Sequence, residues 1–341
     1  MHMVISGGCG FIGANFVKRL LADRPEWRMT VVDALTYAGN LATLRDVDPS
    51  SKAAFIKGDI ADHRFVDALF DGFDAPPEVV VNFAAESHVD RSIAGPRVFI
   101  ETNITGTFNL LEQLRRGKAA RFVQISTDEV YGSLGDTGKF QETTPLNPNS
   151  PYAASKASAD LLVQAYHRTY GVDAITTRCS NNYGPYQFPE KLIPLMIINT
   201  LGHKPLPVYG KGLNVRDWIH VEDHTAGILA ALEQGVAGEV YHFGGASEVD
   251  NLTVVEGILD ILEMGRDNLQ FVADRPGHDW RYAMDFSKAA AAFGWRPRID
   301  FRTGLETTVA WYVDNERWWR PILSGEYMNF YHEWYGDRIS G

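Results

Sequence analysis

The chain has 341 residues, 45% hydrophobic and 22% charged, and this composition indicates a folded protein with a sizeable core and not a disordered chain. The formal net charge of −11 argues against nucleic acid as a partner, because an acidic protein repels a phosphate backbone. Two cysteines are too few for a disulfide framework, and neither a signal peptide nor an apolar run of membrane-spanning length is present. We therefore expect a cytoplasmic protein without a membrane partner, and we predict no metal site.

The first half of the chain alternates short apolar runs with segments of helical periodicity. Strands are predicted at residues 3–6, 29–33, 54–56, 79–83 and 122–126, and helices at residues 11–24, 62–70 and 97–116. Such alternation joins parallel strands by right-handed crossovers. It predicts an α/β fold, with a Rossmann-type doubly wound parallel sheet.

The pattern loosens after residue 181. Five prolines between residues 185 and 207 indicate ordered loop and short elements. Helical patterns return at residues 221–233, 253–262 and 303–315, and residues 239–243 resemble a strand that could belong to either half. We predict a first domain at residues 1–180, with segments near 215–245 returning to it, and a smaller mixed α/β domain formed mainly by residues 181–341.

A glycine turn follows the first predicted strand and opens the first predicted helix. Gly7, Gly10 and Gly13 have the spacing G-x-x-G-x-x-G. Glycines allow a tight turn and a close approach of the backbone to a pyrophosphate, and the free N–H groups of the helix start can bind the phosphates. In this strand–turn–helix context the motif predicts a dinucleotide site.

An acidic residue ends the next predicted strand, about 20 residues after the glycine turn, where the dinucleotide fingerprint requires one. This residue is Asp33. Its carboxylate can accept hydrogen bonds from ribose hydroxyls and would repel a 2′-phosphate, so the predicted cofactor is NAD. Asp59, which follows the third strand, could meet the adenine edge or could equally be a turn residue.

Tyr152 and Lys156 form a Y-x-x-x-K pair. On a helix these positions share one face, so the ammonium can lower the phenol pKa and also reach the nicotinamide ribose. A tyrosinate is a competent base for an alcohol proton. Together with the dinucleotide fingerprint, the pair resembles the extended short-chain dehydrogenase/reductase family.

Adjacent carboxyl groups, Asp128 and Glu129, follow the fifth predicted strand at the edge of the sheet where ligands bind. Oxidation of an alcohol does not need two of them. Elimination of water across two carbons needs an acid and a base, and unlike environments can set two carboxyl groups to these states. From spacing alone, the two could also point to opposite sides, with one merely solvated.

Longer motifs are more specific than the fold. They are AAESHVDRS (84–92), STDEVYG (126–132), NPNSPY (147–152), RCSNNYGPYQ (178–187), PEKLIP (189–194) and DRPGHD (274–279). These motifs resemble those of the dTDP-glucose 4,6-dehydratases. The resemblance spans nearly the whole chain, with departures such as Ser6 and Cys9 at permissive positions of the glycine turn.

The resemblance implies a role for each of the five residues expected in catalysis. Tyr152, with Lys156, would deprotonate the C4 hydroxyl while NAD takes the C4 hydride, and Thr127 would hold the C4 oxygen. Glu129 would then remove the acidified C5 proton, and Asp128 would protonate the leaving C6 hydroxyl. The hydride would return to C6, which leaves a 4-keto-6-deoxy sugar and regenerates NAD.

The same resemblance implies contact residues for both ligands. The NAD contacts are Gly7, Gly10, Phe11, Ile12, Gly13, Asp33, Ala34, Leu35, Thr36, Asp59, Ile60, Phe83, Ala84, Ala85, Ser87, Thr102, Tyr152, Lys156 and Asn182. The nucleotide-sugar contacts are Ser87, Thr127, Asn181, Lys191, Leu192, Pro207, Tyr209, Arg216, Asn251, Arg275 and His278. Lys191, Arg216 and Arg275 supply the local positive charge that a diphosphate requires on an acidic protein.

Alternative functions and the state of assembly complete the expectations. A sugar-nucleotide 4-epimerase would share the glycine turn, Asp33, Tyr152 and Lys156 but would not need the carboxyl pair, and a non-catalytic NAD-binding regulator would need only the first-half motifs. The family implies a homodimer through the helices that begin near residues 97 and 151. We assign the tryptophans at positions 311, 318 and 319 to packing. The nucleotide, dTDP or UDP, does not follow from the residues alone.

Overall fold

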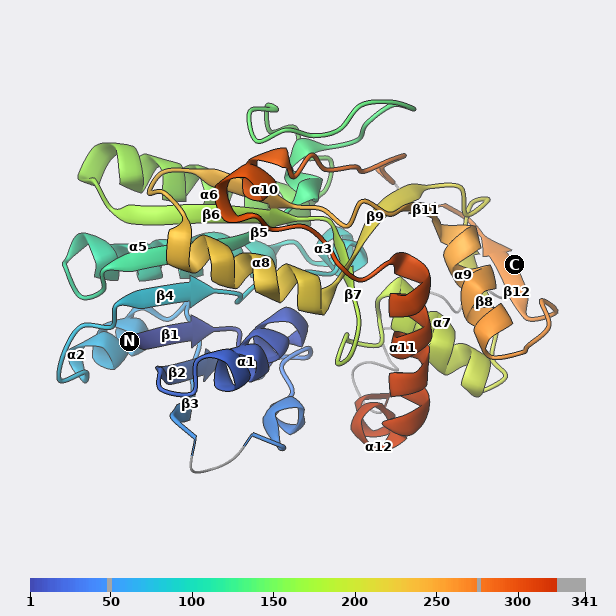
Figure 1. Ribbon diagram of the computed structural model, residues 1–341, viewed down its shortest axis with the longest axis horizontal. Coiled ribbons are helices and arrows are strands. Elements are labelled where there is room, and N and C mark those ends of the chain that lie inside the picture. The colour runs from blue at the N-terminus through green and yellow to red at the C-terminus, as the bar shows by residue number, and fades with distance from the viewer. Residues whose placement is uncertain (48–50, 275–276, 324–341) are drawn as a thin grey trace.

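Seven parallel strands form the central sheet of the computed structural model, which describes residues 1–47, 51–274 and 277–323 (Figure 1). All six strand pairs in this sheet are parallel. The strands lie in the order β10 (Val240–Phe243), β6 (Asp173–Cys179), β5 (Arg121–Thr127), β4 (Val79–Asn82), β1 (His2–Ser6), β2 (Arg28–Asp33) and β3 (Ala53–Lys57). The predicted Rossmann-type fold is confirmed.

Helices cover both faces of this sheet because side chains alternate along buried parallel strands. In β1, Met3 and Ile5 pack into one apolar cluster and Val4 into another. The first cluster includes α1 (Phe11–Asp23), α8 (Val221–Gln234) and α10 (Ser287–Phe293). The second includes α2 (His63–Asp71), α5 (Thr107–Arg115) and α6 (Pro151–Tyr170).

A smaller lobe with its own apolar cluster lies beyond the carboxyl edge of the large sheet (Figure 1). One small sheet has the order β11 (Glu248–Asp250), β9 (Val215–His220) and β7 (Asn181–Tyr183), and another pairs β12 (Leu269–Val272) with β8 (Leu206–Tyr209). The lobe's helices are α7 (Leu192–Leu201), α9 (Asn251–Ile261), α11 (Phe301–Asp314) and α12 (Glu316–Trp319). The remaining short helices are η1 (Leu41–Leu44), α3 (Val89–Ala94), η3 (Asp128–Tyr131) and η4 (Arg320–Leu323).

Two predicted segments differ from the structure. The single helix expected at residues 97–116 is α4 (Arg97–Phe99), a π-helical segment η2 (Ile100–Gly106) and α5. The proline-crowded stretch contains α7, because Pro194 is its third residue and the first four N–H groups of a helix need no intrahelical acceptor.

The strand expected at residues 239–243 lies in the large sheet as β10, whereas β9 pairs in the small lobe. The domain division at residue 180 stays a prediction.

Within the described ranges 1–47, 51–274 and 277–323, no helix is both long and apolar enough to cross a membrane.

Trp311 and Trp318 pack against each other and against Tyr186, and Trp319 is buried in the small lobe's cluster. The contacts of these three tryptophans agree with a packing role.

Gly245, which follows β10, connects the two lobes at a place where no side chain fits. A Cβ atom there would lie 1.7 Å from the carbonyl oxygen of Trp218 in β9. We expect Gly245→Ala to lower the free energy of unfolding by about 1–3 kcal/mol or more, because backbone must move to admit the methyl group. Urea unfolding measures this. Gly135→Ala, whose Cβ would meet nothing within 4 Å, should change stability by less than about 0.5 kcal/mol. Equal stabilities of the two variants would contradict the analysis.

Candidate active site

The glycine turn leaves an opening at one of its three glycines. A Cβ at Gly7, where φ is +71°, would lie 2.5 Å from the amide nitrogen of Ala84, and one at Gly13 would lie 2.3 Å from the carbonyl oxygen of Gly7. At Gly10 the nearest atom, that same oxygen, is 3.4 Å away. Gly10 is also the N-cap of α1 and makes no side-chain cap, so the N–H groups of the first turn point towards this opening. The turn therefore fits a pyrophosphate.

Asp33 is fixed beside this turn by the backbone. Its carboxylate accepts hydrogen bonds from the N–H groups of Cys9 (2.9 Å) and Leu35 (2.8 Å). Burial raises the pKa of Asp33, and these two hydrogen bonds oppose the shift. The carboxylate is thus held at the end of β2, where the fingerprint requires it.

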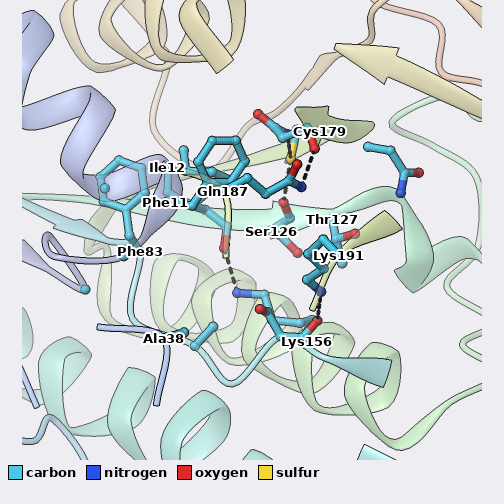
Figure 2. A pocket seen from close by; sticks show the side chains of 18 of the residues that line it. Phe11, Ile12, Ala38, Phe83, Ser126, Thr127, Lys156, Cys179, Gln187 and Lys191 are labelled. Atoms are coloured by element: carbon cyan, nitrogen blue, oxygen red, sulfur yellow. Dashed lines mark hydrogen bonds between the residues drawn. The ribbon is translucent and has the colours of Figure 1, made fainter. Parts of the chain in front are cut away.

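An open cavity extends from the glycine turn to the end of β5 (Figure 2). Figure 2 shows Phe11, Ile12 and Phe83 at one end of the cavity and Thr127 and Lys191 towards the other. Eleven of the predicted NAD contacts line it: Gly7, Gly10, Phe11, Ile12, Gly13, Phe83, Ala85, Ser87, Tyr152, Lys156 and Asn182.

The other predicted NAD contacts do not line this cavity. Ala84 packs its backbone against Gly7, and Ile60 is 4% exposed beneath Gly106. Asp59 accepts the N–H of Ala61 at 2.8 Å, as a turn residue does. The rest are Asp33, Ala34, Leu35 and Thr36, at and after the end of β2, and Thr102 in η2.

Tyr152 and Lys156 line the cavity from the first turns of α6, whose N-terminus is capped by Ser150. The ammonium of Lys156 donates to the carbonyl oxygen of Ile125 at 2.7 Å. Burial raises the pKa of Tyr152 well above its ordinary value, and Glu129 adds to this rise; Lys156 is not among the largest influences. Without ligands, the phenol therefore keeps its proton at neutral pH.

The carboxyl pair also lines the cavity, from η3 directly after β5. Asp128 is 2% exposed, and the hydroxyl of Thr127 donates to its Oδ1 at 3.2 Å. Burial raises the pKa of Asp128 well above its ordinary value, and the charges of Glu129 and Asp217 add to this rise. Burial therefore favours the protonated form of Asp128, while the half-buried Glu129 lines both this cavity and the one beside it.

The adjoining cavity lies between the small lobe and the segment after β4, and it shares Glu129, Asn181, Glu190 and Lys191 with the first. Ser87 and Thr127 line the first cavity. The other described nucleotide-sugar contacts line the second: Asn181, Lys191, Leu192, Pro207, Tyr209, Arg216, Asn251 and His278. Arg275 lies outside the described residues. The two cavities thus bring together residues that lie far apart in the sequence.

Sequence reasoning missed Asn103, which lies in the π-helical segment η2 and is 1% exposed. Its side chain exchanges hydrogen bonds with the backbone of Glu86 (2.9 and 3.0 Å) and donates to the hydroxyl of Ser155 at 2.8 Å. Asn103 therefore ties the loop after β4 to the helix that carries Tyr152 and Lys156. Its signal is a buried asparagine in a helix, and π-helical turns are frequent at functional sites.

Glu190 was also missed, although it lies inside a quoted motif. It lines both cavities, and its carboxylate accepts hydrogen bonds from Arg91 and from the hydroxyl of Tyr37, each at 2.9 Å. Burial raises the pKa of Glu190, and Lys191 and Arg91 lower it.

In the part of the chain that the structure describes, no group of three or more His, Cys, Asp or Glu side chains could hold a metal ion.

The raised pKa of Asp128 predicts that its carboxyl group destabilises the fold at neutral pH. The folded protein keeps the proton where the unfolded chain has lost it, so stability falls as the pH rises above about 4. Asp128→Asn should therefore unfold at a higher temperature than wild type at pH 7, and the difference should shrink towards pH 4. Asp300→Asn is the control, because the pKa of Asp300 is lowered and its replacement should bring no such gain. A pH-independent difference would contradict this reasoning.

Comparisons with known proteins show the family of this chain. The family model for GDP-mannose 4,6 dehydratase matches residues 4–308. A dTDP-glucose 4,6-dehydratase of Xanthomonas campestris pv. campestris is 50% identical over 95% of this chain and 96% of that protein. The crystal structure of a dTDP-glucose 4,6-dehydratase from Streptomyces venezuelae with NAD bound is 49% identical, with a TM-score of 0.91 over 94% of this chain and 100% of that one.

The same fold is found in an epimerase at lower identity. The UDP-glucose 4-epimerase of Thermus thermophilus, solved in complex with NAD, is 28% identical, with a TM-score of 0.85 over 92% of this chain and 100% of that one. Full-length identity near 50% to dehydratases, against 28% to this epimerase, separates the two groups. The chain belongs to the dTDP-glucose 4,6-dehydratases of the extended short-chain dehydrogenase/reductase family.

Proposed function

We propose that this chain converts dTDP-D-glucose into dTDP-4-keto-6-deoxy-D-glucose and water, with NAD as its cofactor. One observation carries the proposal: a buried carboxyl group whose pKa is raised and a half-buried one, Asp128 and Glu129, line the same cavity as the Tyr152–Lys156 pair. An oxidation site and an acid–base pair in one cavity are what a dehydration through a ketone requires.

The glycine turn fits the pyrophosphate of NAD, because Gly10 leaves room and the first turn of α1 presents free N–H groups. Bound NAD supplies the hydride chemistry: it accepts the C4 hydride and returns it to C6, so each turnover regenerates it. Asp33 holds the ribose hydroxyls, and Lys156 the nicotinamide ribose. The carboxylate of Asp33, already fixed by two N–H groups, would repel the 2′-phosphate of NADP.

Oxidation at C4 is assigned to Tyr152, which takes the hydroxyl proton while Thr127 holds the C4 oxygen. Because burial favours the neutral phenol, a cation must stabilise the phenolate that forms. Lys156 is the buried ammonium one helical turn away on the same face of α6. The C4 ketone then makes the C5 proton acidic.

Elimination is assigned to the carboxyl pair. Glu129 removes the C5 proton, and Asp128 donates its retained proton to the C6 hydroxyl, which leaves as water. A carboxyl group whose pKa is raised by burial is suited to act as an acid, and its half-buried neighbour is suited to act as the base. After the hydride returns to C6, C5 regains a proton from the side of Glu129.

The nucleotide end of the substrate is assigned to the second cavity, beside the small lobe. Lys191 stands where the two cavities meet and donates to the carbonyl oxygen of Ser87 at 2.7 Å. Arg216 lines that cavity, and its guanidinium lies 4.4 Å from the ring centre of Tyr282. These cations, with Arg275, would balance the diphosphate. A 4-epimerase would use the cofactor site without the carboxyl pair.

The protein is further proposed to act in the cytoplasm as a homodimer. Apolar side chains are exposed along the segments that begin near residues 97 and 151, namely Val98, Ile100, Phe108 and Leu161. Adjoining apolar side chains on a protein surface favour an interface.

Both cysteines are free and buried, which fits a reducing compartment such as the cytoplasm. Cell fractionation tests the location.

Single-turnover kinetics with dTDP-glucose tests the assigned roles by the step at which each variant stops. Tyr152→Phe should lower the rate of NADH formation by about 10²–10⁴, because the base is lost. Asp128→Asn should still form NADH, which then accumulates, because the leaving hydroxyl receives no proton. Glu129→Gln should also stall, without exchange of the C5 proton into solvent. Full-rate product from Asp128→Asn, or normal C5 exchange in Glu129→Gln, would contradict the assignment and favour an epimerase.

Sedimentation analysis tests the dimer. Leu161 is 54% exposed on α6, and Leu161→Glu would bury a charge in the proposed interface, so this variant should sediment as a monomer at concentrations where wild type is a dimer. Val236→Glu is the matched control, because Val236 is 62% exposed in the turn between α8 and β10, away from those helices. A monomeric wild type, or a dimeric Leu161→Glu variant, would contradict the proposal.

A further inference from the structure

A buried chain of hydrogen bonds runs behind the carboxyl pair, with Arg178 of β6 at its centre. The side chain of Arg178 is almost fully buried. Its Nε donates to Oδ2 of Asp160 at 2.8 Å, and its Nη1 donates to the hydroxyl oxygen of Tyr131 at 2.5 Å. The oxidation and elimination steps proposed above assign no part to this chain.

The protons in this chain have one consistent arrangement. Nδ1 of His242 lies 3.1 Å from the carbonyl oxygen of Asp285, which can only accept, so Nδ1 carries a proton. Burial lowers the pKa of His242 to about 3, so the ring is neutral and its Nε2 is an acceptor. The hydroxyl of Tyr131, 2.6 Å from Nε2, therefore donates to His242 while it accepts from Arg178. Each link thus has a fixed direction.

The chain joins the two halves of the catalytic machinery. Asp160 lies on α6 one helical turn after Lys156. Its Oδ2 also accepts the hydroxyl of Ser126 at 2.9 Å, and Ser126 immediately precedes Thr127 and the carboxyl pair. Tyr131 is the last residue of η3, which begins at Asp128. Both ends of the segment that carries the pair are therefore bonded to one Arg–Asp ion pair, anchored on the helix of the proposed oxidation residues.

We propose that Tyr131, Arg178 and Asp160 form a positioning clamp that holds the elimination carboxyl groups in register with the oxidation site. The clamp rests on the roles assigned to Asp128 and Glu129 under the proposed function. The Tyr131 end of the clamp acts on elimination alone. Removal of the Tyr131 hydroxyl leaves α6, which carries Tyr152 and Lys156, and the Lys156–Ile125 hydrogen bond in place. The positions of a general acid and base are sensitive to small displacements.

Tyr131→Phe is the test variant, because it removes one hydroxyl and leaves the ring stacked on Phe140 at 4.9 Å. Arg178→Lys is the second: lysine can keep the charge but lacks the fork that bonds Asp160 and Tyr131 together. Tyr241→Phe is the matched control, a buried tyrosine whose hydroxyl accepts the N–H of Val236 at 3.0 Å, outside both cavities. Each protein is mixed with dTDP-glucose in single turnover, and NADH absorbance and C5 exchange are followed.

The clamp predicts that Tyr131→Phe forms NADH within about twofold of the wild-type rate but consumes it at least about tenfold more slowly, with C5 exchange slowed in parallel. Arg178→Lys should behave likewise, and Tyr241→Phe like wild type. Equal slowing of every step, or no change in the consumption of NADH, would overturn the clamp. If Asp128→Asn accumulates no NADH in the same experiment, the proposed elimination roles fail instead. Accumulation in Asp128→Asn without accumulation in Tyr131→Phe or Arg178→Lys refutes the clamp alone.

Discussion

The parallel pairing of β5 with β4 on one side and β6 on the other is the constraint on which the site depends. Its register places Asn82 beside Gln124, and Thr127 beside Cys179. Because parallel strands end at one edge, the loop after β4, the turn after β5 and the chain after β6 all emerge together. A shift of this register by one residue would turn the side chains at the end of β5 to the opposite face.

Burial of carboxyl groups is the electrostatic problem that this acidic chain solves in different ways. Asp33 accepts two backbone N–H groups, and Asp160 pairs with Arg178. Asp217 accepts the N–H groups of Gly245 and Ser247 at 3.2 and 2.9 Å. Asp128 receives only the hydroxyl of Thr127, and its Oδ2 has no hydrogen-bond partner among the described residues. Of these four carboxyl groups Asp128 has the fewest hydrogen-bond donors, and burial raises its pKa well above the ordinary value, which favours the protonated form that an acid needs.

The sequence predicted the elements whose signal is local. The β-branched runs of β1, β2 and β4 and the glycine turn between β1 and α1 need no knowledge of distant residues. The π-helical segment could not be predicted, because the pattern of residues 97–116 suits an unbroken helix and Asn103 shows its purpose only beside Glu86 and Ser155. The same holds for Arg178. The reason for an arginine in this buried strand is visible only in the structure, where Arg178 bonds Tyr131 and Asp160, 47 and 18 residues away.

The fold shared with a 4-epimerase shows how local the step from one chemistry to the other can be. In the proposed mechanism, oxidation at C4 uses the cofactor cradle, Tyr152 and Lys156, which lie on the fold that both groups share. The proposed elimination adds two carboxyl groups, both in the single short turn η3. A turn of that length cannot fix its own side chains, since it has few internal hydrogen bonds. The acid and base must therefore take their positions from the protein around them, and the buried bonds of Ser126 and Tyr131 at the two ends of this segment meet that need.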